Sequence, residues 1–265
     1  MNRTSQIIKG AVVAASAVAL VLGATGPAGA TTHHGRARVT FHVTTKGYVH
    51  TLAKQRPGLA HLRVPSAKPV MVVKRKHAGT AALVKDLRAT KSSKLLKQFT
   101  VVSLFDSDTY LTLSRGTYYV VAVAVEHLSA AKVATVHVTG KSVNASVPGS
   151  SAYRIDSRKA LHAPATQSRH SYLHLINGSS HPEELVLFGI SSSTSNADVQ
   201  RFLTHPTESN LEDLDVTDFA LGGLIGPHHQ AWTRARLQAH RYIAVADAID
   251  STSGVFGGAQ LVTVH

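Results

Sequence analysis

The chain contains no cysteine, and this absence excludes more functions than any other feature of its composition. Without thiols there is no disulfide framework, no thiolate zinc site, no iron–sulfur cluster and no cysteine nucleophile. Thioether ligands are scarce too, because Met1 and Met71 are the only methionines. Stability must come from packing, for which 265 residues with 43% hydrophobic side chains suffice.

Acidic side chains are the second scarce class, and their shortage falls on one half. The whole chain holds 28 Lys and Arg against 15 Asp and Glu, a net charge of +13. Residues 31–140 hold 17 basic against 4 acidic side chains, whereas residues 141–265 hold 9 against 11. This asymmetry indicates two units with different surfaces. We therefore predict two domains, over residues 31–140 and 141–265.

The first thirty residues read as an export signal. Arg3 and Lys9 precede an apolar run from Ala11 to Gly23, and small residues end the segment at Ala30. A basic start, a short apolar run and a small-residue cleavage site are typical of a secretory signal peptide. The run is shorter than the roughly 20 residues that cross a bilayer. We expect a bacterial protein cleaved after Ala30, secreted or held in the cell wall, with no membrane span after cleavage.

The two halves follow one pattern. An alternating stretch at 59–64 matches 172–177, so that His61 corresponds to His174. The later elements correspond in the same order. Apolar strands are predicted at 70–73 and 185–190, followed by helices at 81–89 and 196–203 that Thr80 and Ser195 can cap. Next, Leu113 and Tyr118 correspond to Leu237 and Tyr242 at a corner of the chain, and each half closes with a strand, at 133–138 and 260–264. This order favours a tandem repeat of two β-sandwiches. Two unrelated sandwiches with the same rhythm are the alternative.

The second half resembles the cupredoxin-like domains of secreted bacterial proteins, the plastocyanin and azurin superfamily. In segment 173–187 an alternating strand ends in Asn177, and His181 then opens the next strand with Glu183 close behind. Segment 222–227 resembles the loop before the family's penultimate hairpin. The strand pair around its corner is matched by 232–237 and 242–245. Residues 38–140 match more weakly.

The resemblance implies an all-β fold of two Greek-key β-sandwich (cupredoxin-like) domains, each with one short helix in a connection. The family's copper site uses two His, one Cys and usually one Met. His181 falls at the position of the first ligand, but loop 247–258, where the others belong, has no Cys, His or Met. Because a blue-copper centre depends on a thiolate bond, electron transfer there is excluded. We expect degenerate domains, with His181 as a hydrogen-bonding loop residue in preference to a metal ligand.

Histidine is abundant, with 17 residues, and one of them gives an alternative function. After cleavage the chain would begin Thr31-Thr32-His33. The free amine, the backbone amides and the His33 imidazole can enclose Cu(II) or Ni(II) in a square plane. The alternative function is therefore Cu(II) or Ni(II) binding at this terminus, helped by other His. No other cofactor is expected, and scattered surface His is the plainer interpretation of the rest.

A basic strip in the first half is the leading candidate site. Its predicted anion-binding residues are Lys74, Arg75, Lys76, Lys85, Arg88, Lys91, Lys94 and Lys97. Such a strip attracts anionic polymers through screened charge. We expect an anionic envelope polymer or an acidic protein surface as partner, or docking onto the acidic stretch 208–218 of the same chain. Nucleic acid is not expected, because the chain is exported and Phe99 is the only aromatic nearby. A solvated basic face without a partner is the simplest alternative.

Catalytic motifs are missing from the sequence. It contains no Gly-x-Ser-x-Gly and no phosphate-binding Gly loop. The densest carboxylate group, at 208–218, lacks the order of a calcium loop and is predicted to be a solvated acidic loop. We therefore expect an exported, non-catalytic binding or structural protein of the bacterial cell exterior.

Overall fold

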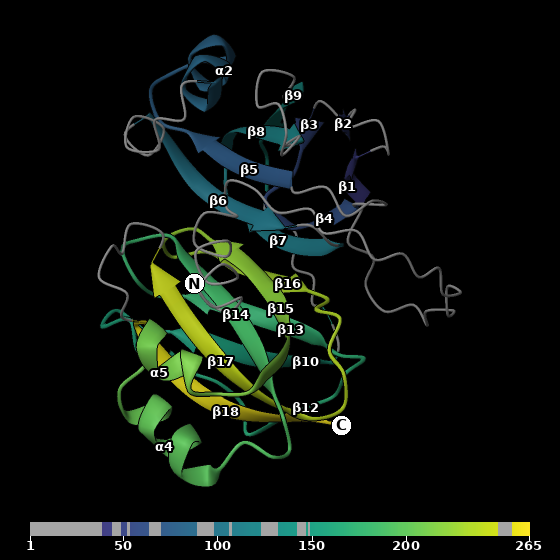
Figure 1. The fold of residues 1–265 in the computed structure, drawn as a ribbon. Coiled ribbons are helices and arrows are strands. Elements are labelled where there is room, and N and C mark those ends of the chain that lie inside the picture. The colour runs from purple at the N-terminus through teal and green to yellow at the C-terminus, as the bar shows by residue number, and fades with distance from the viewer. Residues whose placement is uncertain are drawn as a thin grey trace.

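The computed structural model describes residues 39–43, 49–51, 54–63, 70–88, 98–105, 108–122, 132–141, 147, 149–248 and 256–265. The predicted signal peptide, His33, Lys91, Lys94 and Lys97 lie outside these residues. In the described part the fold is all-β with short helices, and its strands form two sheets (Figure 1). None of the described helices is long and apolar enough to cross a membrane.

One sheet has eight strands, four from each half of the chain. They are β1 (Val39–Val43), β2 (Val49–Thr51), β4 (Gly58–Arg63), β7 (Thr109–Leu113), β10 (Ser150–Ile155), β11 (Leu161–His162), β13 (Tyr172–Asn177) and β16 (Gln230–Thr233). Their order is β11–β10–β13–β16–β7–β4–β1–β2.

The other sheet has ten strands. They are β3 (Lys54–Gln55), β5 (Val70–Arg75), β6 (Phe99–Phe105), β8 (Gly116–Ala122), β9 (Lys132–Val138), β12 (Thr166–Gln167), β14 (Glu183–Ile190), β15 (Val216–Ile225), β17 (Arg241–Ala248) and β18 (Gly258–Val264). Their order is β12–β18–β17–β14–β15–β6–β5–β8–β9–β3.

Both sheets continue across the predicted boundary at residue 140. In the eight-stranded sheet β7 pairs antiparallel with β16. In the ten-stranded sheet β6 pairs antiparallel with β15. Each half contributes its strands in the same order outward from these joints, so that β4, β1 and β2 of one half take the places of β13, β10 and β11 of the other. Equivalent strands therefore meet at the middle of each sheet.

Burial explains why some strand sequences alternate and others are apolar throughout. The largest core cluster lies between the sheets and includes Leu62, Leu111, Leu173 and Val262 from both halves. The ten-stranded sheet is covered on its outer face too, by helix α2 (Thr80–Arg88) in one half and by α4 (Asn196–Thr204) with α5 (Glu208–Glu212) in the other. Its strands are consequently apolar on both faces, whereas β13 of the eight-stranded sheet alternates.

The helix predictions hold with two differences. Ser195 caps α4 as predicted, because its side chain accepts a hydrogen bond from the Asp198 N–H. The predicted cap Thr80 is instead the first residue of α2, whose first turn closes between the Leu83 N–H and the Gly79 carbonyl. The second half also carries one helix more than predicted, since Thr207 caps α5 by accepting from the Asn210 N–H.

The strands predicted on either side of the second half's corner are present as β16 and β17, but they lie in different sheets and do not pair, and the first half is built in the same way. β7 and β16 belong to the eight-stranded sheet, and β8 and β17 to the ten-stranded one. In each half, the chain passes from one sheet to the other at a corner, where a tyrosine hydroxyl forms a hydrogen bond with the backbone of the residue four positions earlier. The Tyr118 hydroxyl donates to the Ser114 carbonyl at 2.9 Å, and the Tyr242 hydroxyl accepts from the Gln238 N–H at 2.8 Å.

Candidate functional site

The basic strip is only partly assembled in the described residues. Arg75 ends β5 and is exposed, as are Lys76 after it and Lys85 on α2. Arg88 ends α2, although its side chain is not among those described. The structure thus places three exposed predicted cations on the β5–α2 segment, which we call the basic end.

Lys74 contacts other residues of the chain, although it was predicted to be part of the anion-binding strip. Its ammonium donates to the Ser114 hydroxyl at 2.7 Å and lies 5.7 Å from the centre of the Tyr118 ring. Ser114 is also the residue to which Tyr118 bonds, so Lys74 reinforces the corner of the first half. This contact holds Lys74 on the protein itself.

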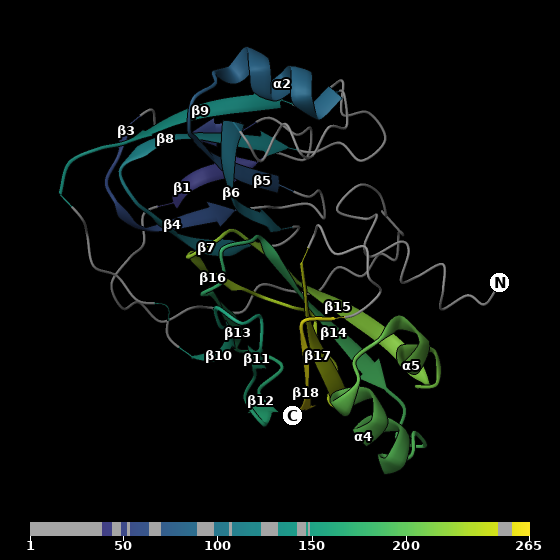
Figure 2. The same cartoon turned by 90° about the vertical axis from the view of Figure 1, so that its left-hand side faces the viewer.

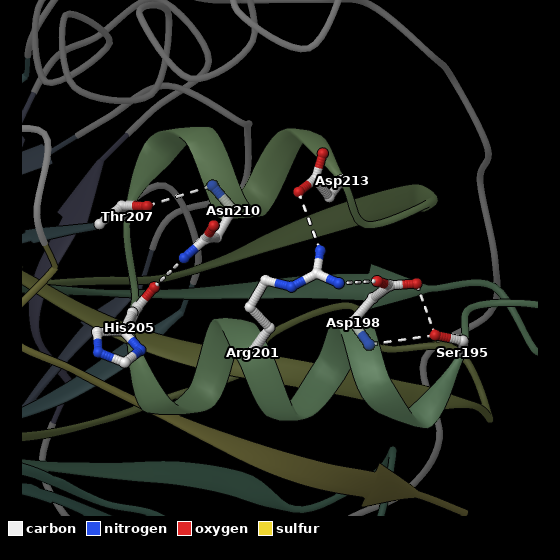
Figure 3. Close-up of polar contacts among 7 residues, drawn as sticks. All are labelled: Ser195, Asp198, Arg201, His205, Thr207, Asn210 and Asp213. Carbon is white, nitrogen blue, oxygen red and sulfur yellow. Dashed lines mark hydrogen bonds and ion pairs between the residues drawn. The ribbon is translucent and has the colours of Figure 1, made fainter.

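The acidic stretch 208–218 contains helix α5 and the start of β15 in place of the predicted loop, although Glu212, Asp213 and Asp215 are exposed as predicted. Figure 3 shows Arg201 of α4 between Asp198 and Asp213, with ion-pair distances of 3.1 Å and 3.3 Å. Further along, Asp218 accepts from Tyr242 at 3.0 Å and lies 3.0 Å from the His240 ring nitrogen. These carboxylates therefore find partners within their own half.

Opposite charges lie at opposite ends of the molecule. Figures 1 and 2 both place α2 at one end and α4 with α5 at the other. Lys85 on α2 therefore does not dock onto the acidic stretch, and the basic end faces away from it. The exposed side chains of Arg75, Lys76 and Lys85 are accessible to an anionic partner from outside the chain.

His181 lies in the exposed turn before β14, where its backbone has a structural role. Its carbonyl accepts from the Asn177 amide at 2.8 Å and from the Ser179 hydroxyl at 2.9 Å. The described residues include no cluster of three or more His, Asp or Glu that could hold a metal ion.

A row of aromatic and histidine side chains crosses the outer face of the eight-stranded sheet. His61 of β4 pairs with Tyr110 of β7, Tyr110 with Trp232 of β16, and Trp232 with His174 of β13. The residues beside them on each strand point into the core, so these four point outward. We call His61, Tyr110, Trp232 and His174 the aromatic row.

Stacking holds the two ends of the aromatic row. The rings of His61 and Tyr110 are 4.3 Å apart and 10° from parallel, and those of His174 and Trp232 are 4.2 Å apart and 11° from parallel. Tyr172 of β13 adds an edge-to-face contact with Tyr110 at 5.6 Å. Polar atoms of the row also have neighbours on this face, since the His174 Nε2 lies 3.1 Å from the Gln230 side-chain oxygen and the His61 Nε2 lies 3.8 Å from Asp108.

Three exposed arginines border the aromatic row on the same face. Arg63 follows His61 by two positions on β4, and Arg154 follows the row neighbour Ala152 by two positions on β10. Arg234 follows Trp232 by two positions, directly after the end of β16. Successive same-face positions are about 7 Å apart. The Arg234 guanidinium lies 4.9 Å from the centre of the Tyr172 ring. Arg63, Arg154 and Arg234 are called the arginine border below.

Burial keeps both histidines of the row neutral near pH 7. It lowers the pKa of His61 below its usual value, Asp108 at 3.8 Å opposes this shift, and Arg63 adds to it. Burial likewise lowers the pKa of His174, against the hydrogen bond to Gln230 and together with Arg154. Around the row, the formal charges of the described residues therefore include the arginine border, Asp108 and, beyond Arg154, Asp156.

Sequence analysis found the equivalence of His61 and His174 but not the surface that they share. The usable signal was strand alternation, which puts each His on an outward position. Tyr110 and Trp232 join them through strand pairing between the halves, which no local pattern reveals.

Comparisons with known proteins return structural neighbours of low similarity. Neither a protein-family model nor a curated protein sequence matches the chain. Among solved structures, auracyanin B is 16% identical with a TM-score of 0.25, covering 46% of this chain and 93% of its own. The copper nitrite reductase of Nitrosomonas europaea is 10% identical with a TM-score of 0.24, over 86% of this chain and 93% of its own. That of Thermus scotoductus is 11% identical with a TM-score of 0.23, over 81% and 54%.

With TM-scores of 0.25 and below, these neighbours carry no argument about the fold of this chain, which rests on its own strands and sheets. At such scores they say nothing about activity. The donor set of a blue-copper centre does not fit this chain, because the sequence has no cysteine to supply the thiolate.

Proposed function

We propose that this chain is an exported, non-catalytic binding protein of the bacterial cell exterior, whose basic first half engages an anionic polymer. The observation that carries the proposal is the separation of charge. Arg75, Lys76 and Lys85 are exposed at one end, while the acidic residues around Arg201 lie at the other. A concentrated positive end attracts polyanions and orients them before contact.

We further propose that the chain is a tandem pair of cupredoxin-like units that no longer bind copper. The support is the equivalent order of strands in the two halves and the corner tyrosines Tyr118 and Tyr242, which bond to positions 114 and 238. The missing cysteine accounts for the lost chemistry. A binding role then uses the outer surfaces of the sandwich in place of a metal site.

Binding to dextran sulfate by titration calorimetry tests the first proposal. The triple variant Arg75→Gln, Lys76→Gln, Lys85→Gln should bind about tenfold more weakly, since each exposed pair contributes up to about 1 kcal/mol. Wild-type affinity should also fall between about 50 and 200 mM salt. The matched control removes three exposed arginines of the second half, with Arg158→Gln, Arg169→Gln and Arg236→Gln. An equal loss in both variants, or no wild-type binding, overturns the proposal.

A further inference from the structure

We propose that the aromatic row and its arginine border form a binding face for an acidic polysaccharide, a chain of sugar rings bearing carboxylates. This inference rests on the proposed function and names the polymer class and a second contact surface. The face lies on the eight-stranded sheet. The basic end lies elsewhere, on β5 of the ten-stranded sheet and on helix α2, which covers that sheet.

The charges of the face select an anion. The arginine border places three guanidinium groups around the row, against the carboxylates of Asp108 beside His61 and of Asp156 beyond Arg154. Guanidinium is planar and matches a carboxylate with two parallel hydrogen bonds. Arg63 and Arg234 lie on one side of the row and Arg154 on the other, as the strand directions require. A ligand that crosses the row can therefore meet cations along both sides.

The aromatic row favours a ligand that has rings in addition to negative charge. It spans four adjacent strands, a width of about 14 Å at the usual strand spacing. Tyr110, Tyr172 and the two His are half-buried around the buried Trp232, so the row presents partly exposed rings that carry both apolar and polar atoms. Sugar rings have the matching character, with C–H groups on their faces and hydroxyls around their edges. A polyphosphate has charge alone and would leave this surface unused.

The probe is polygalacturonate, with two controls that separate charge from ring contact. Its methyl ester keeps the sugar rings and removes the charge, and inorganic polyphosphate keeps the charge without rings. Trp232 is the single tryptophan and stacks on His174, so its fluorescence reports directly on the row. We expect polygalacturonate to change Trp232 emission and to bind at least tenfold more tightly than either control.

Variants of the face complete the test. Arg63→Gln, Arg154→Gln, Arg234→Gln together should weaken polygalacturonate binding more than tenfold, and Tyr172→Ala should weaken it severalfold while Tyr172→Phe does not. All of these positions are exposed or half-buried, and unchanged thermal unfolding verifies the fold. The inference is overturned if polygalacturonate binding is lost in the basic-end triple variant but kept in the arginine-border variant. That outcome contradicts the binding face but leaves the proposed function intact. If the wild type binds neither polygalacturonate nor dextran sulfate, both proposals are wrong.

Discussion

Tyr110 and Trp232 lie directly opposite each other where the two halves of the chain join in one sheet. Beside them Thr109 and Thr233, both buried, share a hydroxyl contact of 3.4 Å across a sequence separation of 124 residues. The joint is therefore built like the interior of a domain. Its core neighbours Leu111 and Ala231 belong to the cluster that fills both halves.

We expect the two halves to unfold together because they share this core. Leu111 is 1% exposed, and Leu111→Ala should cost about 2–5 kcal/mol by opening a cavity. The loss should lower the midpoint of one common transition, seen alike by Trp232 fluorescence and by far-ultraviolet circular dichroism. Leu59→Ala, on the half-buried outer face of β4, is the milder control. Two separate transitions, only one of which responds to Leu111→Ala, would show that the halves unfold independently.

Gly189 allows a polar bridge to cross β14. A Cβ at this position would overlap the Asp218 carboxylate and would lie 2.5 Å from the His240 ring nitrogen. Gly189→Ala should therefore displace Asp218 from His240 and from the Tyr242 hydroxyl, and cost about 1–3 kcal/mol in chemical denaturation. Gly79→Ala is the matched control, since a Cβ there meets nothing within 4 Å. Equal costs in the two variants would contradict the role of the bridge.

Sequence reasoning found the strands because burial leaves a local pattern. The alternation of 172–177 and the apolar run of 185–190 follow from one covered face in one sheet and two in the other. The Ser195 cap was found for the same reason, since the cap and its bonded N–H are three residues apart.

The binding face could not be found in this way. Its row depends on the register between β7 and β16, which is fixed by contacts between residues far apart in sequence. The ion pairs of Arg201 escaped notice for a related reason. Helix α5 places Asp213 beside Arg201 of α4, and this helix was not predicted from the acidic sequence.

Glu184 should make the protein less stable at neutral to alkaline pH. Burial, with help from the facing Asp247, raises the pKa of this carboxyl from 4.5 to about 7. A raised pKa in the folded state means that the stabilisation from the neutral acid is complete below pH 4.5 and is lost as pH rises through 7. Glu184→Gln should thus gain up to about 3 kcal/mol over the wild type at pH 8.

Denaturant titrations at pH 4 and pH 8 measure this effect. The advantage of Glu184→Gln should shrink toward zero at pH 4, where the wild-type carboxyl is protonated in both states. Glu212→Gln, which removes an exposed carboxyl from α5, is the control for the same chemical substitution at a surface position. A pH-independent difference would mean that the amide changes packing and not ionisation.

Alkaline unfolding should begin near pH 10, because several tyrosines are held in their neutral form by the fold. Burial raises the pKa of Tyr242 and of Tyr110 to about 12, and it raises that of Tyr153 as well. These tyrosines ionise in the unfolded chain near pH 10 but not in the folded one, so the stability that they contribute below pH 10 is lost as pH rises toward 12. Absorbance at about 295 nm, where tyrosinate absorbs, should therefore show fewer than the 7 tyrosines of the chain titrating before unfolding. In Tyr242→Phe the fall in stability above pH 10 should be shallower, and an unchanged slope would place the alkaline sensitivity elsewhere.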